Sequence, residues 1–286
     1  MGSVTGGSWA YIAHGREPYM MPKLVCQVLA LVVAVGMIGV SSPGHAQETS
    51  GSPVLVNWTA PASLARLARS AHKVDFFPLS NHFVGQDNKI FCGPTSVAIV
   101  LNALRPRDPG APLTTHSLTP EDRVWMRPGS NPFLRKYTPH NVLTAKTKTR
   151  LEVLGKPLVI DGKRQRDFGL QLRQLAQVFR AHGLAVTTRV VDDQADAAQI
   201  TREIADNLAT ADNFVVINYK RRALGQPGGG HISPLGAYDA DSDSFLVLDV
   251  NPARAPWVWV RAADLIAAMR TFDTVENRGY LLVSEN

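Results

Sequence analysis

The stretch QDNKIFCGPTSVAIVLNAL, residues 86–104, places a cysteine, Cys92, directly ahead of a run with the pattern of a buried helix. Apolar side chains recur along this run, at Val97, Ile99, Val100, Leu101 and Leu104. The segment Gly93-Pro94-Thr95-Ser96 carries helix-start signals, because proline is tolerated in a first helical turn. A thiol at that end of a helix faces the positive end of the helix dipole, which favours the nucleophilic thiolate. The position of Cys92 is therefore an activating one.

Cys92 also has a simpler interpretation, as a small buried apolar residue, which is what most free cysteines are. The chain has only one other cysteine, Cys26, and it lies in a segment that we expect to be removed. A thiol without a disulfide partner in an exported protein is a candidate nucleophile, and at this point the nucleophile and the buried core residue are both open interpretations. Gln86, six residues upstream, is placed to direct an amide N–H to the same point and stabilise a developing oxyanion.

Residues 1–46 have the pattern of an N-terminal extension followed by a cleavable secretory signal. Lys23 precedes the apolar run Leu24–Val40, and Gly44-His45-Ala46 is a small-x-small cleavage pattern. The alternative is an uncleaved anchor, since the run is close to the shortest that spans a bilayer. We expect cleavage, which leaves residues 47–286 as a single exported domain, periplasmic and without stable membrane insertion.

The formal net charge of +6 suits attraction of small acidic substrates, although a solvated basic surface is the better explanation of the charge alone. No nucleic-acid-binding motif accompanies the charge, so no nucleic-acid partner is predicted. The histidines show no metal-ligand spacing, and no metal site is predicted. Residues 105–165 are rich in Pro, Thr, Lys and Arg, and we interpret them as a loop-rich insertion that covers or flanks the core. The oligomeric state stays open, with a dimer as one option.

The second half of the chain alternates helix and strand patterns. Apolar spacing predicts helices over Asp167–His182, ended by Gly183, and over 197–209. Alternation predicts a strand over 185–191, and β-branched and aromatic residues predict a buried strand over 213–219.

The second informative stretch is GQPGGGHISPLGAYDADSDSFLVLDV, residues 225–250. It predicts a hairpin in which His231 begins one strand and Phe245–Val250 forms the returning strand. His231 and Asp249 would then lie on neighbouring antiparallel strands, within side-chain reach. A carboxylate beside an imidazole fixes its tautomer and stabilises the imidazolium that a thiolate requires. Each piece alone has a structural explanation, since the glycine run suits a hairpin loop and single histidines are usually structural.

Taken together, these stretches resemble the catalytic domain of the phytochelatin synthase family, the glutathione γ-glutamylcysteinyltransferases within the papain-like cysteine peptidase clan. The resemblance covers roughly residues 75–104 and 213–285. It rests on Gln86 with FCGPTSVAIVLNAL, on NYKRRALGQPGGGHISPLGAY from residue 218, and on FLVLDV followed by VWV, a helix pattern and RGYLLVS. It implies a papain-like α+β fold in which the nucleophile helix packs on an antiparallel sheet.

The resemblance also implies site roles. Cys92 is the nucleophile, His231 the general acid and base, and Asp249 the residue that orients His231. Gln86 completes an oxyanion hole with the backbone N–H of Cys92. Three further residues match family positions near the γ-glutamylcysteinyl group and are expected to bind substrate, namely Asn218, Arg221 and Arg278.

The activity implied is acyl transfer from glutathione through a γ-glutamylcysteinyl thioester on Cys92. The single-domain form resembles the prokaryotic branch, which favours hydrolysis to γ-glutamylcysteine with phytochelatin as a minor product. No protein-bound cofactor is expected, and Cd or Zn ions would act as activators or as glutathione thiolate complexes. The chain departs from the family after Asp249, where VNPARAPWVWV replaces a stretch ending in Tyr-Pro-Pro, which puts the acceptor side of the site in doubt.

Two rival functions fit the same residues. One is an exported papain-like cysteine peptidase that cleaves leader or cell-wall peptides, which would act on α-linked peptides and ignore the γ-glutamyl group. The other is a non-enzymatic module that binds thiols or metals, in which Cys92 would keep the pKa of an ordinary thiol and alkylate slowly at neutral pH.

Overall fold

A computed structural model describes residues 54–286, which belong to one compact unit. The predicted signal segment and Cys26 lie outside the described residues. None of the helices described in residues 54–286 combines the length and apolar content needed to cross a bilayer.

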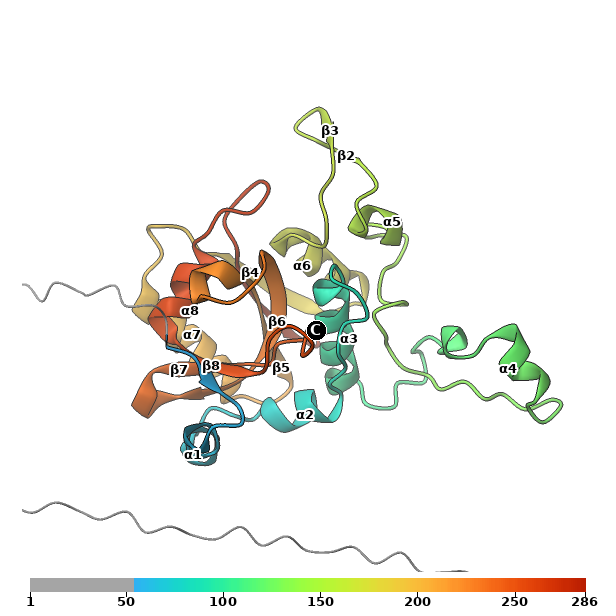
Figure 1. The fold of residues 1–286 in the computed structure, drawn as a ribbon, viewed down its shortest axis with the longest axis horizontal. Helices are drawn as coiled ribbons and strands as arrows, with labels where there is room; N and C mark the ends of the chain where they lie inside the picture. Colours follow the sequence, from blue (N-terminus) through green and yellow to red (C-terminus); the bar gives the residue numbers. More distant parts are fainter. Residues whose placement is uncertain (1–53) are drawn as a thin grey trace, which may run out of the picture. The chain divides into compact units, whose positions relative to one another are not determined.

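The core of the fold is a seven-stranded sheet with the order β1-β8-β7-β6-β5-β9-β4, in which every neighbouring pair is antiparallel (Figure 1). Its strands are β1 (Val56–Asn57), β4 (Ala185–Val190), β5 (Asn213–Lys220), β6 (Gly230–Asp239), β7 (Ser244–Val247), β8 (Val258–Arg261) and β9 (Gly279–Ser284). The β5 and β6 strands are central and buried on both faces, and for β5 this is what its run of β-branched and aromatic residues predicts.

Helices cover both faces of this sheet. Its helices are α1 (Pro61–Arg69), α2 (Phe76–Asn81), α3 (Cys92–Leu104), α6 (Leu172–Ala181), α7 (Ala197–Leu208) and α8 (Ala262–Met269). Alternate residues of β5 separate the two sides: Phe214 and Val216 pack in the core that holds α3 and α6, whereas Val215 and Ile217 pack in the core that holds α7 and α8. The expected α+β class, with the helix that follows Cys92 packed on an antiparallel sheet, is confirmed.

Two predicted boundaries are wrong. The helix predicted over Asp167–His182 begins only at Leu172, because Gly169 has φ +75° and the Asp167 side chain is bonded to Lys148 rather than exposed on a first helical turn. The strand predicted over Phe245–Val250 ends at Val247, so Asp249 lies just beyond the strand.

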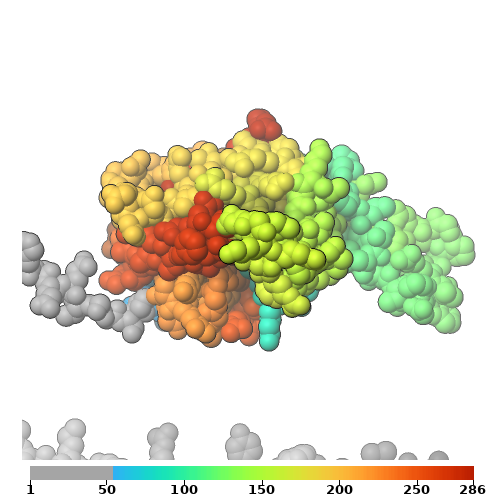
Figure 2. Space-filling model, turned by 90° about the horizontal axis from the view of Figure 1, so that it is seen from above, coloured from blue at the N-terminus to red at the C-terminus, as the bar shows by residue number. Residues whose placement is uncertain are grey.

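Residues 105–165 are largely irregular, as expected. Their regular elements are short: η1 (Thr115–Ser117), α4 (Pro120–Val124), α5 (Arg150–Val153), β2 (Leu158–Ile160), β3 (Lys163–Gln165). The β2–β3 pair forms a separate two-stranded hairpin, and the green segment that contains α4 projects from the rest of the described chain (Figures 1 and 2). Neither the β2–β3 hairpin nor the segment that contains α4 belongs to the seven-stranded sheet that carries the candidate site.

Candidate active site

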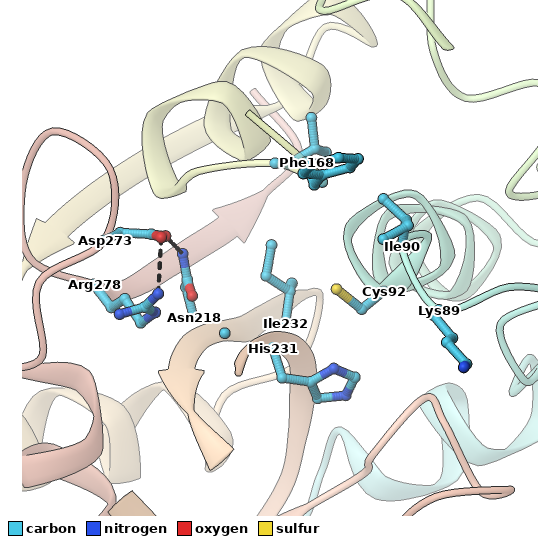
Figure 3. Close-up of a pocket in the computed structure, with 12 residues that line it drawn as sticks. Lys89, Ile90, Cys92, Phe168, Asn218, His231, Ile232, Asp273 and Arg278 are labelled. Atoms are coloured by element: carbon cyan, nitrogen blue, oxygen red, sulfur yellow. Dashed lines mark hydrogen bonds and ion pairs between the residues drawn. The ribbon is translucent and has the colours of Figure 1, made fainter. Parts of the chain in front are cut away.

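Cys92 is the first residue of α3, as its sequence context predicts. The helix packs against β6, and the side chain of Ser96 donates a hydrogen bond to the carbonyl of Ile232, the residue that follows His231. This contact fixes the start of α3 beside the start of β6. The thiol of Cys92 and the ring of His231 therefore face the same cavity (Figure 3).

His231 is held by its neighbours on the sheet. Nε2 of His231 lies 3.0 Å from Oδ1 of Asp249, and both side chains are buried. Tyr219, opposite His231 in the β5–β6 pair, contacts the imidazole edge-on and donates its hydroxyl hydrogen bond to Oδ2 of Asp249 at 3.2 Å. The predicted proximity of His231 and Asp249 is present, although Asp249 reaches the histidine from beyond the end of β7.

The two reactive groups have shifted pKa values. Burial would raise the pKa of the Cys92 thiol, but hydrogen bonding to His231, the charge of His231 and backbone N–H groups of Ile232 and Gly93 lower it below the ordinary value. Burial would lower the pKa of His231, but hydrogen bonds to Asp249 and Cys92 and their charges raise it. Together these shifts favour a thiolate beside an imidazolium, which is the nucleophilic state.

Cys92 and His231 open onto a cavity of about 240 Å³. Its lining comprises Lys89, Ile90, Cys92, Phe168, Gly169, Leu170, Asn218, Gly230, His231, Ile232, Asp273 and Arg278. In Figure 3 the sulfur of Cys92 points into the space between Phe168 and His231, and the polar group formed by Asn218, Asp273 and Arg278 lies on the side away from Cys92.

The polar wall is an ordered network. Arg278 donates to Oδ1 of Asp273 at 2.8 Å, and Asn218 donates to Oδ2 of the same carboxylate at 3.2 Å. Burial lowers the pKa of Arg278, and the charge of Asp273 opposes that shift. Arg278 Nε has no hydrogen-bond partner among the described residues, so this guanidinium retains a free donor beside the cavity. The wall thus offers both a cation and an anion to a ligand.

Of the three residues expected to bind substrate, Asn218 and Arg278 line the cavity and Arg221 does not. Arg221 is absent from the cavity lining, is only 2% exposed, and donates from Nη2 to Oδ1 of Asp249 at 2.7 Å while lying 2.9 Å from Nε2 of His231. This placement favours a role in holding the His231–Asp249 pair over direct contact with substrate.

Gln86 has a backbone hydrogen bond to the carbonyl of Val250, and its side-chain amide donates to the carbonyl of Asn88 at 2.5 Å. Its Oε1 is buried without a partner among the described residues. In this structure the amide serves the loop before Cys92, and the oxyanion role stays a prediction that requires a change of rotamer.

Sequence reasoning missed Tyr219 and Asp273. Tyr219 lies in a predicted buried strand, and the pairing of that strand with His231 would have pointed to it. Asp273 lies in the loop before β9, and no local motif marks it. The described residues contain no group of three or more His, Cys, Asp or Glu side chains able to hold a metal ion.

The family model and the curated relatives that match this chain agree on one family. A family model described as phytochelatin synthase matches residues 47–118 and 131–280. Glutathione γ-glutamylcysteinyltransferase 1 of Triticum aestivum is 30% identical over 219 residues, which cover 73% of this chain and 36% of that protein. Glutathione γ-glutamylcysteinyltransferase 3 of Lotus japonicus is 26% identical over 212 residues, 73% of this chain and 37% of that protein.

The chain thus spans well under half the length of these curated relatives. Among solved structures, the peptidase domain of Streptococcus ComA, a bi-functional ABC transporter, aligns with 72% of this chain and 98% of its own, at 12% identity and a TM-score of 0.38.

Proposed function

The chain belongs to the phytochelatin synthase family, and from that premise we propose that it cleaves glutathione through a γ-glutamylcysteinyl thioester on Cys92. The observation that carries the proposal is the placement of the Cys92 thiol and His231 on one side of a cavity whose other side presents Asn218, Asp273 and Arg278. The curated relatives are named for glutathione γ-glutamylcysteinyl transfer, which is the chemistry this site is suited to perform.

The first half-reaction uses the thiolate–imidazolium pair. The Cys92 thiolate attacks the carbonyl carbon of the Cys–Gly amide, forming the C–S bond and moving charge to the carbonyl oxygen. The backbone N–H of Cys92, and Gln86 once its amide turns from Asn88, would donate to that oxyanion. Collapse breaks the C–N bond, and the His231 imidazolium gives its proton to the departing glycine amine.

The second half-reaction depends on the acceptor. Neutral His231 takes a proton from water, the hydroxide attacks the thioester, and γ-glutamylcysteine leaves as Cys92 recovers its thiolate. The amine of a second glutathione at the same step gives phytochelatin. We propose hydrolysis as the main reaction, supported by the replacement of the family's Tyr-Pro-Pro stretch with VNPARAPWVWV on the acceptor side.

The polar wall suits the free end of a γ-glutamyl group, which carries an α-carboxylate and an α-ammonium on one carbon. Arg278 would take the carboxylate and Asp273 the ammonium, and Asn218 would hold Asp273 in place. An α-linked peptide has no such zwitterion at this distance from the scissile amide. The wall therefore favours a γ-glutamyl thiol peptide over an α-linked peptide.

The test is incubation of the full chain with glutathione, with and without cadmium, followed by mass spectrometry. Glycine with γ-glutamylcysteine identifies a hydrolase, and products extended by γ-glutamylcysteine units identify a synthase. Cys92→Ala is the matched control and is expected to release no glycine. Untouched glutathione under both conditions, with cleavage of α-linked peptides, would replace this proposal by the exported peptidase.

Two further proposals accompany the reaction. Heavy-metal ions would enter as glutathione thiolate complexes rather than as bound cofactors, and the reaction with cadmium tests this through the length of the products. Export to the periplasm is supported only by the pattern of residues 1–46, and fractionation of cells that express the tagged chain tests it.

A further inference from the structure

A buried ion pair lies next to the cavity but outside the groups that the proposed reaction uses. Nζ of Lys148 is 2.7 Å from Oδ2 of Asp167, and their side chains are only 4% and 3% exposed. The same ammonium donates to the carbonyls of Asp167 and Gly169 at 2.7 and 2.8 Å, and to Oε1 of Gln174 at 3.3 Å. A buried charge is costly unless it is paired and hydrogen-bonded. The Lys148 ammonium has both an anionic partner and acceptors for all of its N–H groups.

Asp167 is bonded as extensively as Lys148. Its Oδ2 accepts from the side-chain amides of Gln171 and Gln174 at 2.9 and 3.0 Å, besides Lys148. Its Oδ1 accepts from the hydroxyl of Thr274 at 3.4 Å. Burial would raise the pKa of Asp167, but the hydrogen bonds from Lys148 and the two glutamines lower it, so the carboxylate stays ionised.

The bonds of this pair reach two segments that line the cavity. Lys148 donates to the carbonyl of Gly169, which belongs to the wall formed by residues 168–170. Asp167 accepts from Thr274, the residue that follows Asp273 of the polar wall. The first wall also touches the nucleophile helix, since a Cβ on Gly93 would meet Cδ1 of Leu170 at 2.9 Å. The ion pair is therefore a bridge between the wall at residues 168–170 and the loop that carries Asp273.

We propose that Lys148 and Asp167 are positioning residues that fix the separation of these two walls and so set the affinity for the γ-glutamylcysteinyl group. The identity of the bound group rests on the proposed function, whereas the bridge itself rests on the contacts above. Neither residue touches the reacting atoms. Their removal should therefore weaken substrate binding and leave the Cys92–His231 chemistry in place.

The first test is Lys148→Met, compared with Arg69→Met. Arg69 pairs with buried Asp239, so each variant leaves a buried carboxylate without its cation, but the Arg69 pair lies away from the cavity lining. Lys148→Met should raise KM for glutathione about tenfold with kcat changed less than threefold, the ratio of about ten matching the loss of one buried charged contact. Arg69→Met should lower Tm comparably with KM unchanged.

Alkylation of Cys92 by iodoacetamide separates this role from damage to the nucleophile. The rate should equal that of the parent in both variants, because iodoacetamide is small and uncharged. If Lys148→Met folds poorly, Lys148→Met/Asp167→Leu removes the unpaired charge and should recover Tm, since apolar replacement of a buried pair is often neutral. KM should nevertheless stay raised in the double variant, because the bonds to Gly169 and Thr274 are lost.

Hydrogen–deuterium exchange tests, without any substrate, whether the Lys148–Asp167 pair stabilises the two walls that it connects. Lys148→Met should speed exchange in peptides covering residues 166–172 and 270–278, with α7 and α8 unaffected. Unchanged exchange in both peptides, or an unchanged KM in a variant with normal Tm, would overturn the inference. If the parent chain leaves glutathione intact, the proposed function fails, and the exchange result still decides the bridge.

Discussion

Cys92 and His231 depend on each other for their charge states. The pKa of Cys92 is lowered by its hydrogen bond to His231, and that of His231 is raised by Asp249 and Cys92. The reactive thiolate–imidazolium state exists between these two pKa values, above that of the thiol and below that of the imidazolium. Lowering the first and raising the second widens the pH range over which the enzyme works. Asp249 contributes at the alkaline end, because its charge stabilises the imidazolium.

Asp249→Asn tests this dependence while preserving shape. The asparagine oxygen can still accept from Arg221 and from the backbone N–H of Asn251, so the geometry at Oδ1 is kept. Loss of the negative charge should lower the pKa of His231, and the alkaline limb of the rate profile should move to lower pH. We expect kcat to fall about a hundredfold, because the general acid–base contribution of His231 depends on this carboxylate.

The measurements are the pH profiles of glycine release and of Cys92 alkylation by iodoacetamide. Asp241→Asn is the control, because its side chain is 74% exposed and lies outside the cavity lining. An Asp249→Asn profile that keeps its alkaline limb would show that Asp249 does not set the pKa of His231.

At the level of elements, the strands of the site could be predicted because their patterns are local. β5 follows from its β-branched run, β6 follows from the glycine-rich loop that precedes it, and α3 follows from its apolar face. The start of α6 could not be predicted in this way, because Lys148 reaches Asp167 from 19 residues upstream and removes it from the helix. Asp273 was missed for a similar reason. It is a loop residue, and it is placed at the cavity by hydrogen bonds from Asn218 of β5 and from Arg278, which directly precedes β9.

The start of β6 passes close to the guanidinium of Arg278. A Cβ on Gly230 would meet Nη2 of Arg278 at 2.9 Å, whereas a Cβ on neighbouring Gly229 would meet nothing within 4 Å. Gly230→Ala should therefore push Arg278 away from Asp273 and raise KM for glutathione about fivefold to tenfold, with kcat nearly kept. Gly229→Ala, the matched control, should leave both constants unchanged. Steady-state kinetics of the two variants measure these constants. Equal KM values for Gly230→Ala and Gly229→Ala would show that Arg278 does not contribute to substrate binding.

At the scale of the whole molecule, one buried carboxylate opposes stability. Asp75 precedes α2, is 1% exposed, and has one oxygen with no hydrogen-bond partner among the described residues. Burial raises its pKa to about 8. Between its ordinary pKa near 4 and about 8, the folded state holds a proton that the unfolded state has lost. The free energy of unfolding should therefore decrease as pH rises through this range.

Asp75→Asn removes this pH dependence. At pH 7 the variant should be more stable by about 4 kcal/mol, because the unfolded Asp75 is ionised over roughly three pH units in which the folded one is not. At pH 4, where the unfolded carboxyl is about half protonated, the difference should fall to about 0.5 kcal/mol or less. Urea unfolding at the two pH values measures it, with the exposed Asp193→Asn as control. A variant less stable than the parent at pH 7 would mean that Asp75 has a charged partner when folded.

Residues 119–130 differ from the rest of the described chain in two independent respects. They fall in the gap of the family match, between residues 118 and 131, and every one of them is exposed. Their described links to neighbouring segments are weak: Arg123 donates to the carbonyls of Thr115 and Leu118 at 3.3 Å and lies over the ring of Phe133. Neither core of the sheet includes a side chain from this segment.

Replacement of residues 119–130 by a Gly-Ser linker of equal length should therefore change the free energy of unfolding by less than about 1 kcal/mol, because only exposed local contacts are lost. The value of kcat/KM for glutathione should stay within about twofold, as expected for exposed changes. Replacing Phe168 and Leu170 by serine is the contrasting variant, because both line the cavity, and it should impair binding. Thermal unfolding and steady-state kinetics measure both effects. Loss of activity in the linker variant alone, with normal unfolding, would mean that the segment containing α4 contributes to substrate or acceptor binding rather than being an accessory of the catalytic domain.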